Sequence, residues 1–392
     1  MRGSDRRLPW GYDRRMSDFR VVIAGGGIAA VEGLLRLRRL LGDSVDLRLL
    51  APGGDLVYRP TAVRQPFAFG PPKRHSLDRI AADNGAEHIR DSLASVDRDA
   101  RVVGTGGGQT LEFDALLVAV GARQVPAYPH VRTFSDAEAD ETYQGVVQDV
   151  EGGYAKSMAF LVPEGPVYPL PIYELALMTA ERAYSMGIED FEVSVVTPEP
   201  SPLAVFGQAA SEAVSRLLED AGITVYASAI AEALEVGRLL IQPQGAELHP
   251  QRMVAMPRLE GPAIPGLGGG GPHGFIPIDN SCCVPGTQAR IYAAGDAVAY
   301  PVKHGGLGAQ MADTAASAIA RLAGADVEYT EFLPTIRGKL LTGKAPLYIS
   351  ARVVGPSGFL SEVHDEPPWP EDDKIVAEEL GPYLAQLEAR PA

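Results

Sequence analysis

The sequence predicts an α/β fold with two parallel sheets covered by helices. Short apolar runs alternate with segments of helical length, and this alternation occurs twice, over residues 19–50 and 157–227. Buried parallel strands show little polar alternation because helices cover both faces of their sheet. The chain has 392 residues, more than one hydrophobic core usually accommodates, so we expect more than one domain.

Charge and composition exclude several partners and indicate a location. The chain has 35 Lys and Arg and 50 Asp and Glu, so its net charge of −15 argues against a nucleic acid or an anionic lipid surface. No apolar run reaches the roughly 20 residues of a transmembrane segment. The two cysteines, Cys282 and Cys283, are adjacent and cannot link distant segments, so a cytoplasmic protein is expected. Residues 1–17 are arginine-rich without an apolar segment, which predicts a disordered extension.

The first strand is followed by a glycine-rich turn and a helix. The spacing Gly25-x-Gly27-x-x-Ala30 is the Gly/Gly/Ala form of a dinucleotide fingerprint. Gly25 permits the tight turn, Gly27 lets a pyrophosphate approach the backbone, and Ala30 lets helix and strand pack closely. The helix start at Ile28 offers free N–H groups and a positive dipole end to phosphates.

The second strand, over residues 45–50, lacks the acid that this motif commonly carries. The matching place is near Ala51, which has no side chain for holding ribose hydroxyls. Either a neighbouring group replaces the acid, or adenosine is bound more loosely.

Further elements complete this first part of the chain. We expect a helix over residues 77–86, a strand over 87–96, and a strand over 100–103 that begins a hairpin. The buried strand that starts at Asp114 ends in a turn at Gly121 and Ala122. That turn is a candidate second contact with a dinucleotide.

The second βαβ unit has a different turn. We expect strands over 157–162 and 191–197 with a helix over 173–186 between them. The connecting loop, Pro163–Glu174, contains prolines, which lack N–H donors, and a single glycine. The loop is therefore a degenerate nucleotide turn, or a rigid wall facing the other domain.

A third segment repeats the features of the first. A strand over 289–294 ends in Gly295-Asp296, and a helix of small residues follows over 306–323. An acid after a strand is often only a turn or a helix cap. Together with the first turn, it indicates a second part of the same dinucleotide site.

With these three segments in this order, the chain resembles the FAD-dependent pyridine nucleotide-disulfide oxidoreductase superfamily. Within it, the chain looks like the sulfide:quinone oxidoreductases and the type II NADH:quinone oxidoreductases, with support from Tyr58-Arg59-Pro60 and Thr197–Gly207. The resemblance implies two Rossmann-like dinucleotide-binding domains. It divides the chain into an FAD-binding domain in two parts (18–130 and 266–330), a degenerate NAD-type domain (131–265) and a C-terminal cap with an acidic tail (331–392).

The resemblance also implies FAD as the cofactor and assigns residues to it. Asp296 would bind the ribityl hydroxyls, and Lys303 would add a cation near the flavin. The N-terminus of the helix at Gly306 and Leu307 would face the pyrimidine edge. The cofactor-binding residues implied are Gly25, Gly27, Ile28, Ala30, Arg59, Gly121, Ala122, Gly295, Asp296, Lys303, Gly306 and Leu307.

The chain departs from both sister families. Sulfide:quinone oxidoreductases use paired cysteines beside the flavin, whereas Cys282 and Cys283 stand elsewhere and are expected in a turn or the core. The chain therefore lacks the usual means of sulfide oxidation. The C-terminus has acidic flanks, so its apolar positions are expected to pack on the protein body or on a second subunit, which makes a homodimer a candidate. We expect these positions to form one helical face: Ile375, Val376, Leu380, Tyr383, Leu384 and Leu387.

These features predict an FAD-dependent oxidoreductase that transfers hydride or electrons at the flavin. Its partners would be a small-molecule electron donor, with NAD(P)H as the candidate, and an acceptor that is a quinone or another small molecule. One alternative is a quinone- or sulfur-linked reductase with a different redox centre, and another is an FAD-loaded binding protein without turnover. We expect no metal site and assign no catalytic residue, although His304 is the histidine nearest the predicted flavin edge.

Overall fold

The computed structural model describes residues 19–135, 139–268, 272–328, 331–354, 358–369 and 373–389. The extension predicted over residues 1–17 lies outside these ranges.

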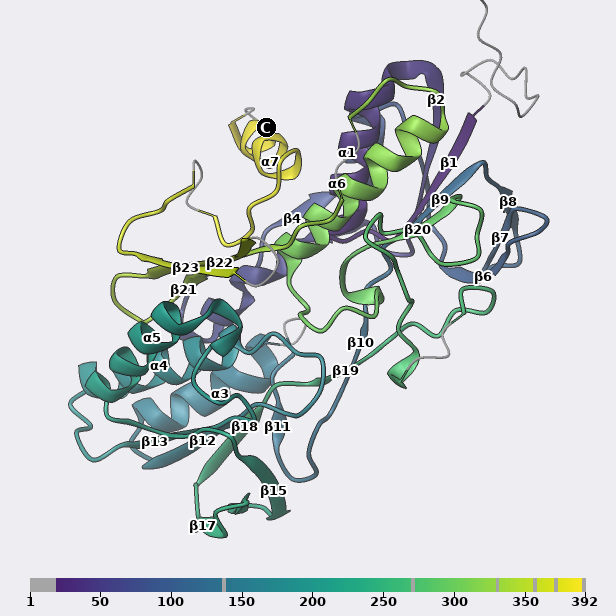
Figure 1. The fold of residues 1–392 in the computed structure, drawn as a ribbon. Helices are drawn as coiled ribbons and strands as arrows, with labels where there is room; N and C mark the ends of the chain where they lie inside the picture. Colours follow the sequence, from purple (N-terminus) through teal and green to yellow (C-terminus); the bar gives the residue numbers. More distant parts are fainter. Residues whose placement is uncertain are drawn as a thin grey trace, which may run out of the picture.

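The first parallel sheet is built from segments far apart in the sequence. Its strand order is β20–β9–β1–β2–β5, and every neighbouring pair is parallel. Helices α1 and α6 lie side by side along this sheet (Figure 1). The elements are β1 (Phe19–Ala24), α1 (Ile28–Leu41), β2 (Val45–Leu50), β5 (Glu87–Ile89), β9 (Ala115–Val118), β20 (Ile291–Ala293) and α6 (Gly305–Leu322).

The second parallel sheet has the order β11–β18–β12–β13–β14. The antiparallel pair of β10 (Arg123–Val125) and β19 (Arg258–Glu260) runs between the two sheets (Figure 1). The elements of this part are β11 (Arg132–Thr133), α3 (Ala139–Glu151), β12 (Ser157–Leu161), α4 (Leu170–Ser185), β13 (Glu192–Val196), α5 (Gln208–Asp220), β14 (Ile223–Tyr226) and β18 (Arg252–Ala255). Two helix-covered parallel sheets confirm the predicted α/β class with Rossmann-like units.

Smaller elements border the two sheets, and most were not expected. The predicted strand over 87–96 is wrong as one element: the chain turns after β5, where the Asp91 N–H donates to the Ile89 oxygen at 2.9 Å, and β6 joins another sheet. The first group is β3 (Asp55–Val57) with β4 (Arg74–Ser76), the 3₁₀ segment η3 (Arg59–Phe67), and α2 (Leu77–Asp83). Three-stranded sheets are formed by β6 (Leu93–Asp97), β7 (Val102–Thr105) and β8 (Thr110–Glu112), by β15 (Ile230–Glu235), β16 (Arg238–Gln242) and β17 (Ala246–Leu248), and by β21 (Thr335–Leu340), β22 (Leu347–Val354) and β23 (Gly358–His364).

The C-terminal segment packs on the protein body. Ile375, Leu380 and Leu384 are buried against the core that α1 and α6 share. The prediction of one helical face is wrong, because α7 (Leu380–Ala389) begins only at Leu380, so Ile375 and Val376 lie in irregular chain before it.

A buried carboxylate of α1 caps α7. Glu32 accepts hydrogen bonds from the backbone N–H groups of Glu379 at 3.0 Å and Leu380 at 2.7 Å. Burial and the neighbouring Glu32 carboxylate raise the pKa of Asp313, on α6, to about 9. Asp313 therefore keeps its proton at neutral pH, beside the buried Glu32 carboxyl that caps α7.

The protonation of Asp313 makes stability depend on pH. Between about pH 5 and pH 8 the unfolded chain releases a proton from this residue that the folded chain retains, so the free energy of unfolding should fall as pH rises, by about 1.4 kcal/mol per unit. In Asp313→Asn this slope, measured by urea denaturation, should be smaller. Asp43→Asn changes a fully exposed carboxyl and should keep the wild-type slope. An unchanged slope in Asp313→Asn would contradict this assignment.

An ion pair joins the C-terminal segment to α4. Lys374 Nζ donates to both carboxylate oxygens of Glu174, at 2.6 and 2.7 Å, and the side chains are 10% and 0% exposed. The Leu341 N–H donates to the same carboxylate at 3.0 Å. Burial raises the pKa of Glu174 and lowers that of Lys374, so each charge depends on the other for its stabilisation.

Breaking this pair on one side should destabilise the protein. Lys374→Met and Glu174→Gln each disrupt a buried charge pair, which typically costs about 3–5 kcal/mol when a partner charge is left behind. The double variant leaves no charge behind, so its loss of unfolding free energy should be smaller than the sum of the single losses. Urea denaturation of the four proteins measures this coupling, and strictly additive losses would refute it.

Candidate functional site

The glycine-rich turn after β1 lies at the carboxyl edge of the first sheet, where ligands of open α/β sheets bind. Gly25 has a φ of +126°, and a Cβ there would overlap the carbonyl oxygen of Ala119 just after β9. Gly27 is exposed, and no described heavy atom lies within 4 Å of the position of a Cβ. The fold therefore requires glycine at position 25, whereas the space beside Gly27 is not filled by the protein.

Gly27 is also the N-cap of α1, and its cap position has no side-chain hydrogen bond. The first intrahelical bond runs from the Val31 N–H to the Gly27 oxygen, so the N–H groups of Ile28, Ala29 and Ala30 precede the helical ladder. Donors of this kind at a helix N-terminus form an anion site. The turn therefore fits the diphosphate of a dinucleotide.

Helix α6 brings a second N-terminus to the same edge. A Cβ on Gly295, whose φ is +72°, would lie 3.3 Å from Ala29 Cβ, and one on Gly308 would lie 3.0 Å from Gly295 Cα. A Cβ on Gly305 would lie 3.1 Å from Ile28 Cδ1. These close approaches bring Gly295 and the start of α6 against Ile28 and Ala29 at the start of α1. Of the other predicted residues, Ala30 and Gly306 lie in the first turns of α1 and α6, Asp296 follows Gly295, and Gly121 and Ala122 follow β9.

Two of the predicted cofactor residues, Lys303 and Leu307, donate hydrogen bonds to groups of the protein itself. The Lys303 ammonium donates to the carbonyl oxygens of Asp296, at 3.2 Å, and Val298, and lies 3.8 Å from the ring centroid of Phe275. Burial lowers its pKa to about 8. The Leu307 N–H donates to the Nδ1 atom of His304 at 3.2 Å.

His304 is a helix cap. It is the N-cap of α6, and its ring packs against Tyr168 with 4.7 Å between centroids. Burial lowers its pKa to about 4, so the ring is neutral at physiological pH. The capping role was missed from the sequence, because histidine is not among the residues that usually cap a helix N-terminus.

The C-terminal segment borders the site, which the sequence did not indicate. The Tyr58 hydroxyl accepts from the Ile375 N–H and contacts an Asp373 carboxylate oxygen, both at 3.1 Å. A Cβ on Gly305 would lie 2.8 Å from Ile375 Cδ1. The predicted Arg59 follows Tyr58 at the start of η3 and is exposed.

The two cysteines are core residues, as predicted. Cys282 and Cys283 are both buried, and Cys283 forms a β-bridge with Tyr292 in β20. Burial raises the pKa of Cys282 to about 12 and also raises that of Cys283. Both thiols stay protonated at neutral pH, and a protonated thiol is a poor nucleophile.

The second βαβ unit differs at its own turn. Pro169 is the N-cap of α4, and a further proline lies in its first turn. Glu199 follows β13 at the place where this unit carries a ribose-binding acid. Its carboxylate accepts from the Tyr173 hydroxyl at 2.8 Å and from the Thr197 hydroxyl at 3.1 Å. The acid is present but is bonded within the protein.

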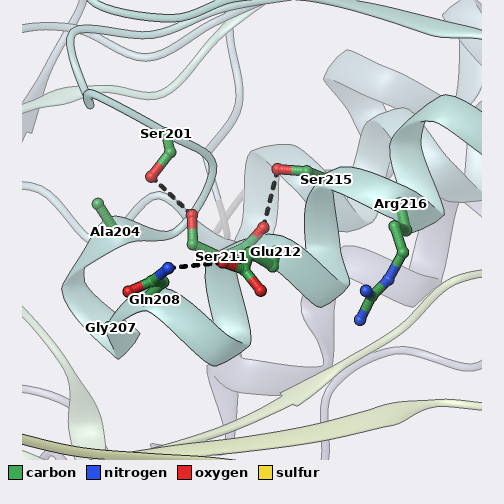
Figure 2. Close-up of a pocket in the computed structure, with 8 residues that line it drawn as sticks. All are labelled: Ser201, Ala204, Gly207, Gln208, Ser211, Glu212, Ser215 and Arg216. Atoms are coloured by element: carbon green, nitrogen blue, oxygen red, sulfur yellow. Dashed lines mark hydrogen bonds between the residues drawn. The ribbon is translucent and has the colours of Figure 1, made fainter.

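A depression of about 640 Å³ lies at the start of α5 (Figure 2). Its polar side chains bond one another: Ser211 donates to Ser201 at 2.7 Å, and Gln208 to Glu212 at 2.7 Å. None of the residues assigned to the cofactor lines it. In the described parts of the chain, three or more His, Cys, Asp or Glu side chains nowhere gather as metal ligands would, and none of the described helices is long and apolar enough to cross a membrane.

Comparison with known proteins gives no matching family model, but it gives similar chains. A sulfide-quinone reductase of Aquifex aeolicus is 24% identical over 300 residues, which cover 72% of this chain and 69% of that protein. Apoptosis-inducing factor 1 of Saccharomyces cerevisiae is 29% identical over 116 residues, and these span 30% of each protein.

Solved structures show the same fold. The sulfide:quinone oxidoreductase of Aquifex aeolicus has a TM-score of 0.76 at 19% identity and covers 89% of this chain and 87% of its own. A ferredoxin reductase of Rhodopseudomonas palustris has a TM-score of 0.65 at 20% identity, covering 86% and 83%. An NAD-dependent persulfide reductase of A. fulgidus has a TM-score of 0.60 at 18% identity, covering 86% and 64%. The sequence similarity to the sulfide-quinone reductase and the fold shared with these reductases support the predicted resemblance to the FAD-dependent pyridine nucleotide-disulfide oxidoreductase superfamily.

Proposed function

We propose that the chain is an oxidoreductase that binds FAD at the N-termini of α1 and α6 and takes hydride from NAD(P)H. FAD supplies hydride and electron transfer, and the protein supplies binding, orientation and electrostatics. The observation that carries the proposal is the meeting of two helix starts at one sheet edge, with Gly27 exposed at the start of α1.

The residues at this edge have distinct roles in the proposal. The N–H groups of Ile28 to Ala30 bind the diphosphate, and the Asp296 carboxylate accepts from ribityl hydroxyls. Gly121 and Ala122 border the adenosine side. The start of α6 at Gly306 directs its positive dipole end to the flavin edge where negative charge develops on reduction. The buried Lys303 ammonium adds a positive charge beside Asp296.

The second βαβ unit and the two cysteines bear on the electron donor and acceptor. The β12–α4–β13 unit repeats the dinucleotide-binding topology and has Glu199 after its second strand. The similar persulfide reductase is described as NAD-dependent, which supports a nicotinamide donor. Cys282 and Cys283 are buried as thiols, which argues against a sulfur-carrying cysteine pair. We therefore propose NAD(P)H as donor and a small molecule, such as a quinone, as acceptor.

Gly27→Asp separates cofactor binding from folding. Its φ of −91° suits an aspartate, and aspartate is a favoured N-cap, so the thermal stability of the apoprotein should be kept or raised. Its carboxylate would face the diphosphate, so FAD should bind at least about tenfold more weakly, equivalent to about 1.4 kcal/mol. Gly25→Ala should instead disrupt folding, because its Cβ overlaps the Ala119 oxygen. Full affinity of Gly27→Asp for FAD would refute the site.

Anaerobic titration of the FAD-loaded protein tests the donor. We expect NADH or NADPH to bleach the flavin absorbance and sulfide to leave it unchanged. Cys282→Ser/Cys283→Ser is the control and should be reduced at the wild-type rate, because neither thiol is ionised. Bleaching by sulfide alone would replace the proposal with a sulfur-linked reductase. No bleaching by any of the three reductants would refute the nicotinamide donor and favour a binding protein without turnover.

A further inference from the structure

The carboxyl end of β2 has no acid of its own. Ala51 is buried there, and its Cβ is 3.2 Å from the place of a Cβ on Gly26 in the glycine-rich turn. In dinucleotide-binding units the adenosine ribose lies over this strand end and donates its hydroxyl hydrogen bonds to a carboxylate. A carboxylate that binds this ribose would therefore have to come from a neighbouring element.

Helix α2 lies directly against this turn. A Cβ on Gly26 would lie 2.7 Å from Leu77 Cδ1, and the Leu77 N–H donates to the Gly54 oxygen at 2.8 Å. Leu77 is the first residue of α2, and Asp78 is the second. Asp78 therefore lies next to both the glycine-rich turn and the end of β2, although it is distant from them in sequence.

A buried histidine connects Asp78 to the strand end. His88 lies on β5, and its Nε2 atom is 3.2 Å from the Ala51 carbonyl oxygen, while its Nδ1 atom is 2.6 Å from Asp78 Oδ1. Arg90 donates to the other oxygen of Asp78. The His88 side chain is 3% exposed, whereas that of Asp78 is 51% exposed. His88 and Arg90 thus hold the Asp78 carboxylate in place, and the carboxylate remains accessible to solvent.

We propose that Asp78 is the carboxylate that binds the adenosine ribose, in place of the acid missing at Ala51. The inference rests on the proposed FAD site at this edge. Each Asp78 oxygen accepts one of the two hydrogen bonds above, and each can accept two, so a ribose hydroxyl can donate to it without displacing His88 or Arg90. His88 is a positioning residue. The exposed Arg90 guanidinium, 3.7 Å from the place of a Cβ on Gly54, offers a planar face beside the base.

The test compares the binding of FAD, of FMN and of an FAD analogue without ribose hydroxyls to the apoprotein. The dissociation constants are measured by quenching of flavin fluorescence. Asp78→Ala should weaken FAD roughly 10- to 100-fold, as expected for a hydrogen bond to a charged group. Its affinity for FMN, which has no adenosine, should not change. An FAD analogue without ribose hydroxyls should bind the wild type more weakly than FAD does, and should bind Asp78→Ala and the wild type equally.

Two further variants test whether the position of the Asp78 carboxylate, and not merely the loss of one negative charge, determines the affinity for FAD. Asp43→Asn removes an exposed carboxylate elsewhere and should bind all three flavins as the wild type does. His88→Ala should weaken FAD but not FMN, and should add nothing to the loss in Asp78→Ala. Unchanged affinity of Asp78→Ala for FAD, or a parallel loss for FAD and FMN, would overturn the proposal. Equal affinity of the wild type for FAD and for the analogue without ribose hydroxyls would also overturn it, and this measurement does not depend on any variant. A wild type that binds neither FAD nor FMN would show instead that the proposed function itself fails.

Discussion

The structure depends on the close approach of α1 to α6 and to the sheet beneath them. A Cβ on Gly33 would lie 2.5 Å from Leu117 Cδ2 and 3.6 Å from Ala312 Cβ, and one on Gly25 would overlap Ala119. Small residues at these points let both helices start at the same sheet edge. A larger residue at 33 would collide with Leu117 on β9 and push α1 away from the sheet, which would displace the start of α1 from the start of α6.

The C-terminal segment adds buried charge to this arrangement. Glu32 caps α7 from within α1, and Lys374 reaches Glu174 on α4, so the segment is tied to both parallel sheets. Buried ion pairs contribute little net stability because desolvation offsets their attraction. The ion pair and the Glu32 cap instead fix the position of the segment: Ile375 is held against Gly305 at the start of α6, and the segment becomes one wall of the proposed cofactor site.

The sequence was sufficient for the parts that depend on local patterns. The apolar run before Gly25 and the Gly295-Asp296 turn predicted the first sheet, because strand burial and glycine turns are encoded within a few residues. The contacts that complete the proposed site are between residues distant in the sequence. Nothing near Ala51 indicates that His88 would join it to Asp78, and nothing near Gly305 indicates Ile375. The split of the predicted strand over 87–96 has the same cause, since pairing partners decide where a strand ends.

The charge distribution is compatible with an anionic cofactor at the proposed site, although the chain is acidic. The net charge is −15, yet the first turns of both α1 and α6 contain no acidic residue. An acid there would stabilise the free helix through its dipole and would compete with the ligand for the same N–H groups. Asp78 lies at the other end of the proposed cofactor, where the groups to be bound are hydroxyls, and the Arg90 guanidinium offsets its charge. In the proposed site, acidic residues are thus absent from the helix starts that would bind phosphates, and a carboxylate with a guanidinium beside it lies where hydroxyls would bind.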